Sequence, residues 1–225
     1  MLSLVRRIWI FLVCAFLGVP LVSVIYQAVA TLDVLTQVER ERDEWQRPSD
    51  VLALLSLREG DTVVDLGCGA GYFALKLSPM VGTTGVVLAT DIRLESLAFL
   101  WIRATIGRRG NLRVIHGQPD DPRLPPVAAD AVLISNTYHE LAEPKRLLEI
   151  LFRALRSGGR LVVLDRGPRP AAGDARQHAV GHRLEPAIVE RDIRGAGFVV
   201  ASREDRFIDR PVDDDIWWVI AAHKP

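Results

Sequence analysis

The sequence predicts an α/β protein built on a doubly wound sheet of mainly parallel strands, with helices on both faces. Seven short apolar runs have the length of buried strands, and helix-like segments separate most of the first five. The last two runs are joined by a polar loop alone, which favours an antiparallel pair at one sheet edge. With 225 residues, 49% of them hydrophobic, the chain is long enough to bury one such core.

The expected elements follow one another in a regular order. The predicted strands are Thr62–Leu66, Gly85–Thr90, Leu112–His116, Ala131–Ser135, Arg160–Leu164, Phe198–Ala201 and Ile216–Ala222. The predicted helices are a short one capped by Ser49 or Asp50 and ending at Leu57, then Tyr72–Val81, Leu94–Ile106 and Leu141–Leu155. Unbroken apolar runs that alternate with helical patterns are typical of a parallel sheet covered on both faces.

The first thirty residues contain a long apolar run. From Ile8 to Ala30 the sequence continues for 23 residues without a charged side chain. At 1.5 Å per residue, a helix of this length crosses a hydrocarbon core of about 30 Å. Arg6 and Arg7 precede the run, and Ala28-Val29-Ala30 has the small-x-small form of a signal-peptidase site. The length favours a retained transmembrane anchor, and the flanking residues also fit a cleaved secretory signal.

The chain therefore divides into three expected parts. Residues 1–30 form an N-terminal transmembrane anchor or signal sequence, residues 31–48 a helical connector, and residues 49–225 the α/β domain. The charges that flank the apolar run do not decide its orientation. The arginines before it favour an N-terminus inside the cell, whereas Arg40, Arg42 and Arg47 favour the opposite.

The composition excludes some partners. Basic and acidic residues number 28 each, so the formal net charge is zero, which argues against a nucleic-acid partner. The two cysteines, Cys14 and Cys68, form neither a disulfide framework nor a metal motif. His178 and His182 are four residues apart and would need further ligands to hold a metal ion. We expect no nucleic-acid partner and no bound metal.

A glycine-rich turn follows the first predicted strand in "VVDLGCGAGYF", residues 63–73. Gly67, Gly69 and Gly71 allow a tight turn and a close approach of the backbone to a ligand. Their spacing is G-x-G-x-G, which differs from the dinucleotide pattern G-x-G-x-x-G, and no Gly-Lys-Ser/Thr phosphate loop is present. Asp91 ends the next apolar run, where a carboxylate can accept hydrogen bonds from both ribose hydroxyls. Asp65 opposes a pyrophosphate but suits a ligand with ammonium and sulfonium groups.

Taken in order, five segments resemble the class I S-adenosylmethionine-dependent methyltransferases. They are "VVDLGCGAG" (Val63–Gly71), "LATDI" (Leu88–Ile92), "GQPDDPRLPP" (Gly117–Pro126), "ADAVLISNTYHEL" (Ala129–Leu141) and "LRSGGRLVVLD" (Leu155–Asp165). The resemblance extends over residues 44–224, and "WQRP" with "NTYHEL" is similar to a mostly uncharacterised bacterial subgroup. It implies a Rossmann-like sheet of seven strands with an antiparallel last strand, and S-adenosylmethionine as cofactor.

The same resemblance implies roles for individual residues. The three glycines would pass under the methionine part of the cofactor, and Asp65 would organise their turn. Asp91 would hold the ribose, with Ile92 against the adenine. Asp120 would meet the adenine amino group, although Gln118 and Asp121 are equally near in sequence. Asn136 would lie beside the methionine and the methyl group.

The segment "SNTYHEL" follows a central strand and is the expected place of catalysis, because open α/β sheets bind ligands at the carboxyl ends of their strands. His139 is the candidate general base, since its ordinary pKa of about 6.5 suits proton removal near neutral pH. Glu140 would orient it and Tyr138 would line the acceptor pocket. Alternatively, His139 caps the helix predicted to begin at Leu141, or only packs there. The basic segment Arg166–Arg183 is a candidate substrate lid or a solvated loop.

These features predict an enzyme that transfers a methyl group from S-adenosylmethionine to a small-molecule or lipid-like acceptor. We expect a single-pass membrane protein with a cytoplasmic catalytic domain, because the cofactor is made in the cytosol; export after signal cleavage is the alternative. Two other functions remain open: an NAD-dependent oxidoreductase, which the glycine spacing and Asp65 disfavour, and a non-catalytic S-adenosylmethionine-binding protein.

Overall fold

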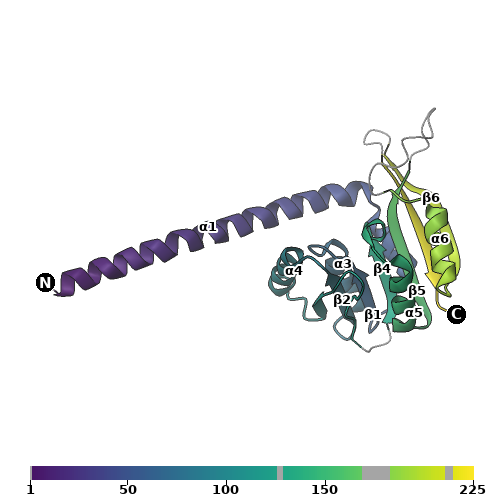
Figure 1. Cartoon of the computed structure of the whole chain (residues 1–225), viewed down its shortest axis with the longest axis horizontal. Helices are drawn as coiled ribbons and strands as arrows, with labels where there is room; N and C mark the ends of the chain where they lie inside the picture. The colour runs from purple at the N-terminus through teal and green to yellow at the C-terminus, as the bar shows by residue number, and fades with distance from the viewer. Residues whose placement is uncertain (1, 126–128, 169–182, 211–214) are drawn as a thin grey trace. The chain divides into compact units, whose positions relative to one another are not determined.

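The computed structural model describes residues 2–125, 129–168, 183–210 and 215–225; the side chains of residues 2–21, 24 and 25 are outside this description. The chain forms two compact units, residues 1–45 and 46–225. The first is a single helix, α1 (Leu2–Trp45) (Figure 1). The connector predicted to be helical therefore continues the helix of the apolar run as far as Trp45.

The predicted membrane segment, Ile8–Ala30, lies largely outside the described side chains. Where side chains are described, no helix combines the length and the apolar character that a membrane span requires.

The second unit contains one sheet of seven strands in the order β3-β2-β1-β4-β5-β7-β6. The strands are β1 (Thr62–Leu66), β2 (Val86–Asp91), β3 (Leu112–His116), β4 (Ala129–Ser135), β5 (Leu155–Gly167), β6 (Val199–Arg210) and β7 (Asp215–His223). Neighbouring strands are parallel from β3 through β5, whereas β7 runs antiparallel to both β5 and β6. The predicted fold class of the sheet, including its antiparallel last strand, is confirmed.

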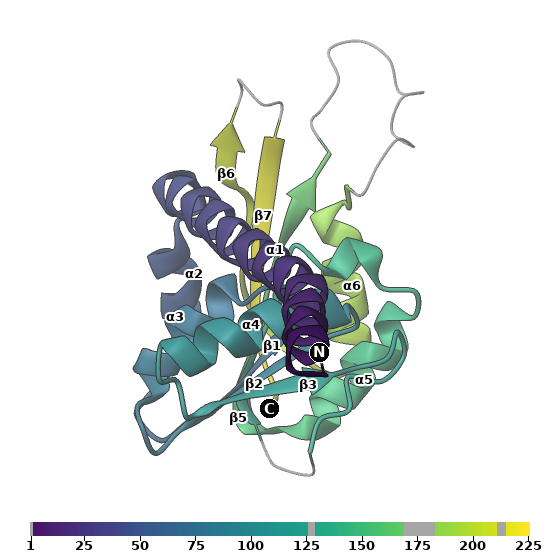
Figure 2. The ribbon, with the colours of Figure 1, turned by 90° about the vertical axis from the view of Figure 1, so that its left-hand side faces the viewer.

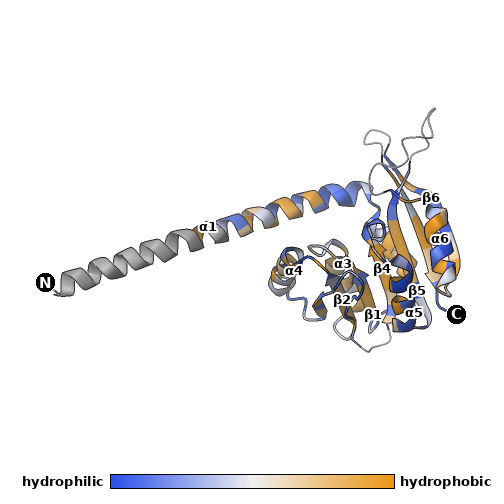
Figure 3. Ribbon diagram, viewed as in Figure 1, coloured by the Kyte–Doolittle hydropathy of each residue, from blue (hydrophilic) through white to orange (hydrophobic). Residues whose placement is uncertain are grey.

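Helices cover both faces of this sheet. They are α2 (Pro48–Leu55), α3 (Tyr72–Val81), α4 (Leu94–Ile106), the 3₁₀ turn η1 (Tyr138–Glu140), α5 (Pro144–Ala154) and α6 (Pro186–Gly195). Figure 2 shows α2, α3 and α4 on one side of the sheet and α5 and α6 on the other. The central strands between them are hydrophobic (Figure 3), and Leu133, Ile134 and Val162 are fully buried there. Because helices pack on both faces, the ends of the central strands are fixed in position. A binding site can be built on strand ends that are held in this way.

Some element boundaries differ from the predicted ones. The helix predicted from Leu141 begins at Pro144, because a proline at the first helical position needs no hydrogen-bond acceptor. Neither Ser49 nor Asp50 caps α2: it starts at Pro48 after Arg47 (φ +53°), whose guanidinium donates a hydrogen bond to Asp50. It ends at Leu55, two residues earlier than predicted.

Strands β6 and β7 are longer than predicted and lie side by side (Figure 2). The charged stretch from Arg203 to Arg206 belongs to β6, although its side chains interrupt the apolar pattern. It remains a strand because β6 is the edge of the sheet, where outward charges are tolerated.

Candidate functional site

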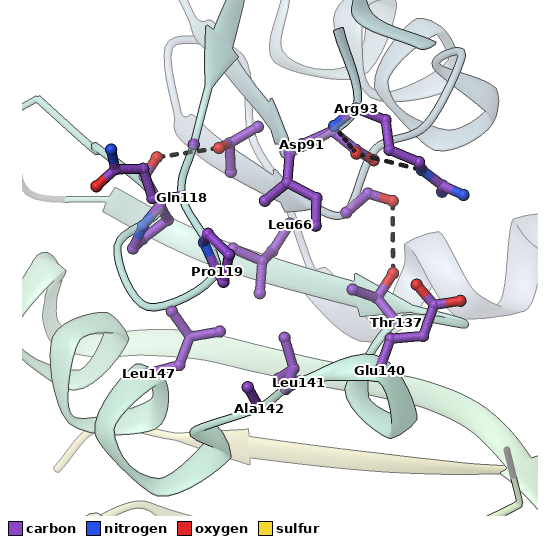
Figure 4. Close-up of a pocket in the computed structure, with 15 residues that line it drawn as sticks. Leu66, Asp91, Arg93, Gln118, Pro119, Thr137, Glu140, Leu141, Ala142 and Leu147 are labelled. Carbon is purple, nitrogen blue, oxygen red and sulfur yellow. Dashed lines mark hydrogen bonds and ion pairs between the residues drawn. The ribbon is translucent and has the colours of Figure 1, made fainter. Parts of the chain in front are cut away.

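The candidate site lies where the strand order reverses. The chain passes from β1 outward to β3 on one side and then returns to β4 on the other, so the carboxyl ends of β1 and β4 diverge there. A cavity of about 130 Å³ lies at this edge (Figure 4). Its lining comes from the ends of β1 and β2, from the loop after β3 and from the segment after β4: Leu66, Gly67, Thr90, Asp91, Ile92, Arg93, Gly117, Gln118, Pro119, Pro122, Thr137, Glu140, Leu141, Ala142 and Leu147.

Asp91 ties the glycine turn to the end of β2. Its side chain is almost fully buried, and its two oxygens accept hydrogen bonds from the backbone N–H groups of Gly69 (2.8 Å) and Arg93 (2.9 Å). The Arg93 guanidinium lies 3.6 Å from the same carboxylate. A carboxylate offers about four acceptor positions, so Asp91 retains capacity for ribose hydroxyls.

The glycine turn is closely packed on two sides and open on the third. Gly67 and Gly71 have positive φ angles, and a Cβ atom at these positions would collide with the side chains of Thr137 and Leu100 respectively. At Gly69, also with positive φ (+54°), a Cβ atom would meet nothing within 4 Å. Of the three glycines, Gly69 is therefore the one at which an added Cβ atom would point into open space.

Among the cofactor residues expected from the sequence, Gly67, Asp91 and Ile92 line the pocket. Asp65 is buried near the end of β1, next to the turn, and Gly71 directly precedes α3 as its N-cap residue. The structure thus brings these residues to one strand edge. The contacts expected between them and the cofactor stay predictions.

In the loop after β3, Gln118 and Pro119 line the pocket, whereas Asp120 does not. The carboxylate of Asp120 is half-exposed and lies 3.3 Å from the Arg146 guanidinium. Gln118 and Asp121 exchange backbone hydrogen bonds of 2.6 and 3.2 Å, which fold the loop into a tight turn. Of the three residues that the sequence left open for the adenine amino group, the geometry favours Gln118.

Asn136 directly follows β4 in the left-handed conformation (φ +52°), and its N–H donates to the carbonyl of Leu164. Its Oδ1 and the Oγ of Ser135 are buried and have no hydrogen-bond partner among the described residues. Buried polar atoms without partners are costly in a finished core. Beside a pocket lined by their neighbour Thr137, they fit the polar groups of a ligand such as the methionine part of S-adenosylmethionine.

His139 is held by a carboxylate that the sequence analysis did not single out. Asp165 ends the apolar part of β5 and is fully buried, with Oδ1 2.7 Å from His139 Nδ1 and Oδ2 3.1 Å from the His139 backbone nitrogen. The Nε2 atom lies 3.6 Å from Glu140 Oε1, beyond hydrogen-bond range. Asp165, and not Glu140, therefore orients the imidazole. Its place at the carboxyl end of the strand next to β4 was the sequence signal for this role.

This arrangement raises the pKa of His139 above its ordinary value. The hydrogen bond that His139 Nδ1–H donates to Asp165 is the main cause, and the negative charges of Asp165 and Glu140 act in the same direction. Burial and the positive charge of Arg166 lower the pKa, but their combined effect is smaller than that of the causes that raise it. Glu140 is half-exposed and lines the pocket, whereas the side chain of His139 is only 5% exposed and does not.

Two expectations about this segment are wrong. Tyr138 does not line the pocket: it is buried in the core under α6, where its hydroxyl lies 3.4 Å from Asp192, and burial with that carboxylate raises the pKa of its phenol. His139 does not cap a helix at Leu141, because α5 begins at Pro144. The pair His178 and His182 and most of the candidate lid, Arg166–Arg183, lie outside the described residues.

Comparison with known proteins identifies the domain. Residues 64–163 match the family described as "Methyltransferase domain". This chain carries a class I S-adenosylmethionine-dependent methyltransferase domain. S-adenosylmethionine is the cofactor of such domains, and the open turn at Gly69, the carboxylate of Asp91 and the buried polar atoms after β4 fit it.

Three similar proteins extend the comparison. The crystal structure of an S-adenosylmethionine-dependent methyltransferase from Aquifex aeolicus matches with a TM-score of 0.66 and 26% identity, over 78% of this chain and 88% of that chain. The ubiquinone/menaquinone biosynthesis C-methyltransferase UbiE of Salmonella arizonae is 34% identical over 110 residues, 48% of this chain and 44% of that protein. The chain thus spans less than half the length of this curated relative. The cyclase SpnF shares the fold, with a TM-score of 0.67 and 19% identity over 80% and 81% of the two chains.

Proposed function

We propose that this protein transfers a methyl group from S-adenosylmethionine to a small-molecule or lipid-like acceptor. The observation that carries the proposal is that one pocket joins two sets of residues. Gly67 and Asp91 belong to the cofactor side, and Thr137 and Glu140 belong to the segment after β4. Donor and acceptor must meet within about 3.5 Å in line for such a displacement, and a shared pocket meets that need.

The residues of the pocket have distinct roles in this proposal. When bound, S-adenosylmethionine supplies an electrophilic methyl group. Asp91 and the turn at Gly69 hold the ribose and the chain next to it, and Glu140 holds a polar group of the acceptor. Asp165 keeps the imidazole proton of His139 on Nδ1, which makes Nε2 the nitrogen that accepts a proton from the acceptor.

Two measurements on the full chain test this function. Calorimetric titration should show saturable binding of S-adenosylmethionine and no binding of NADH. Labelled methyl transfer into membrane and soluble extracts of cells that lack the protein should then show which fraction holds the acceptor. A preference for NADH would refute the proposal.

The two competing functions have less support. The Tyr-x-x-x-Lys spacing used by many NAD-dependent oxidoreductases occurs once, at Tyr72 and Lys76, but Tyr72 is buried where α3 leaves the glycine turn. A non-catalytic or differently acting protein is the better alternative, because the fold of SpnF shows that a cyclase can share this architecture. Cofactor binding without label transfer in any extract would favour it.

We also propose that the protein is anchored in a membrane by residues 1–30, with the catalytic domain in the cytoplasm. The apolar run Ile8–Ala30 supports the anchor, and the cytosolic origin of the cofactor supports the orientation. Within the second unit, the first residues lie near the carboxyl end of β6: Arg47 donates a 2.7 Å hydrogen bond to the carbonyl of Phe207 and stacks on its ring. The carboxyl end of β6 is at the same edge of the sheet as that of β5, where Asp165 lies. This arrangement and the similarity to UbiE favour a lipid-like or quinone-like acceptor.

A further inference from the structure

Helix α4 carries apolar side chains on two faces, one buried and one exposed. One face buries Leu97, Leu100 and Ala104 against the sheet. The other exposes Leu94 and Trp101, which are 59% and 61% accessible and share a helical face because they are seven residues apart. Ile92 before the helix and Ile106 at its end are 53% and 73% accessible.

Four large apolar side chains on and beside one helix are more than the scattered exposure that a soluble surface normally shows. Apolar area favours removal from water by roughly 25 cal/mol per Å², so several exposed apolar side chains gathered on one helix indicate an interaction site. Tryptophan is the side chain most characteristic of a membrane–water interface, because its ring is apolar and its N–H is polar. Trp101 is therefore well suited to the boundary of a lipid bilayer.

The charges around this face are strongly biased. Residues 92–109 contain four arginines and one glutamate, a local net charge of +3 in a chain whose total is zero. The arginines are Arg93, Arg103, Arg108 and Arg109, and the glutamate is Glu95. Arg108 is exposed and Arg109 is partly exposed. Basic side chains that flank exposed apolar ones are typical of surfaces that bind anionic lipids.

We propose that the exposed face of α4, defined by Ile92, Leu94, Trp101 and Ile106, lies on the surface of an anionic lipid bilayer. The apolar side chains enter the interface and the flanking arginines contact lipid headgroups. Ile92 and Arg93 also line the cofactor pocket, so docking brings the rim of the pocket to the lipid surface. The inference goes beyond methyl transfer, since it requires neither catalysis nor the anchor.

A second copy of the chain is a less suitable occupant. In a two-fold symmetric contact, the same surface patch meets itself, so the arginine cluster would face another arginine cluster. Like charges brought together in this way oppose association. An anionic surface, in contrast, matches both the charge and the apolar part of the face.

Site-directed spin labelling of the full chain tests the proposal. Ala98, on the exposed face of α4, and Ala187, exposed on α6, give a matched pair for the variants Ala98→Cys and Ala187→Cys, both in a Cys14→Ser background in which the remaining Cys68 is buried. Each protein is reconstituted in vesicles of phosphatidylcholine, with or without phosphatidylglycerol. Relaxation by oxygen and by a water-soluble nickel chelate reports the environment of the label.

The expected result is a several-fold loss of nickel contact and a gain of oxygen contact at residue 98, only in vesicles that contain phosphatidylglycerol. The label at residue 187 should not change. Arg108→Gln with Arg109→Gln should abolish the effect, whereas Arg58→Gln with Arg153→Gln, which removes the same charge elsewhere, should not. Unchanged nickel contact at residue 98 would overturn the proposal. An equal loss of nickel contact at residue 98 in both vesicle types would also overturn the proposal. Spin–spin broadening, which shows a second copy of the chain on this face, would do the same. Binding of S-adenosylmethionine by the same variants, measured by calorimetry, tests the proposed function separately. A protein that binds the cofactor but does not contact the lipid contradicts this inference alone.

Discussion

Asp91 combines a structural and a binding role in one buried carboxylate. Its oxygens hold the backbone N–H groups of Gly69 and Arg93, and thereby set the curvature of the glycine turn and the course of the chain after β2. The same carboxylate lines the pocket. A side chain that both shapes the turn and faces the ligand cannot be replaced by one that only fills its volume.

We predict that Asp91→Asn weakens the binding of S-adenosylmethionine by about ten- to a hundredfold, because hydrogen bonds to a charged group contribute roughly 1.5–3 kcal/mol. The amide nitrogen of asparagine also places a donor against an N–H group. Calorimetry measures the affinity, and thermal unfolding shows whether the turn is kept. Asp121→Asn is the matched control, since Asp121 is exposed and its side chain accepts a local hydrogen bond from the backbone of Arg123. An unchanged affinity in Asp91→Asn would remove Asp91 from the binding site.

Asp165 should control the pH dependence of methyl transfer. If neutral His139 accepts the proton, activity rises as pH rises through the pKa of His139. Because Asp165 raises that pKa, the rising limb of wild type should lie above pH 6.5, and Asp165→Asn should move it to lower pH. Label transfer into the active extract, measured across pH, gives both profiles.

Variants of the neighbouring residues separate positioning from proton transfer. His139→Gln should lower kcat by about a hundredfold or more and abolish the rising limb, with cofactor affinity kept. Glu140→Gln should chiefly raise KM for the acceptor, because Glu140 is assigned to acceptor contact. A rising limb that persists in His139→Gln would exclude His139 as the titrating group.

At the scale of elements, the glycine turn combines packing and binding in neighbouring positions. Gly71→Ala places a methyl group against Leu100 of α4, and Gly69→Ala places one in open space. Both substitutions place an alanine at a positive φ, +54° at residue 69 and +96° at residue 71. A left-handed alanine costs roughly 1–2 kcal/mol, and the wider angle at residue 71 adds to that cost. We therefore predict that Gly71→Ala lowers the melting temperature more, whereas Gly69→Ala has the larger effect on S-adenosylmethionine affinity relative to its loss of stability. Equal stability and equal affinity in the two variants would contradict an open ligand space at Gly69.

The elements that the sequence predicted well are those whose pattern is local. Short apolar runs located β1 through β5. For β1 and β4 the reason is that a strand buried on both faces needs no polar alternation. Strand β6 was predicted too short because its charged residues are tolerated only by its position at the sheet edge. The role of Asp165 was missed, and that of Tyr138 was misjudged, for a related reason. Their partners, His139 and Asp192, are 26 and 54 residues away and come together only through the sheet topology.

At the scale of the whole molecule, three features of the second unit lie at or near the same edge of the sheet. The pocket opens at the carboxyl ends of the strands, the chain enters this unit near the carboxyl end of β6, and the exposed face of α4 begins at the pocket rim. An acceptor that resides in a bilayer would reach such a pocket without crossing much water. Membrane association and a lipid-like acceptor therefore support one another as proposals.

The orientation of the anchor depends on where the cofactor is made. A domain that uses a cytosolic cofactor must stay inside the cell, which requires Arg40 and Arg42 to outweigh the two arginines before the apolar run. In intact spheroplasts, the catalytic domain of the full chain should resist added protease, and it should be digested once the membrane is permeabilised. Arg40→Gln with Arg42→Gln should reduce the protected fraction. Arg58→Gln should not, because Arg58 is too far from the apolar run to influence its insertion. Digestion in intact spheroplasts would overturn this orientation, and a mature N-terminus at Thr31 would establish export by signal cleavage in place of an anchor.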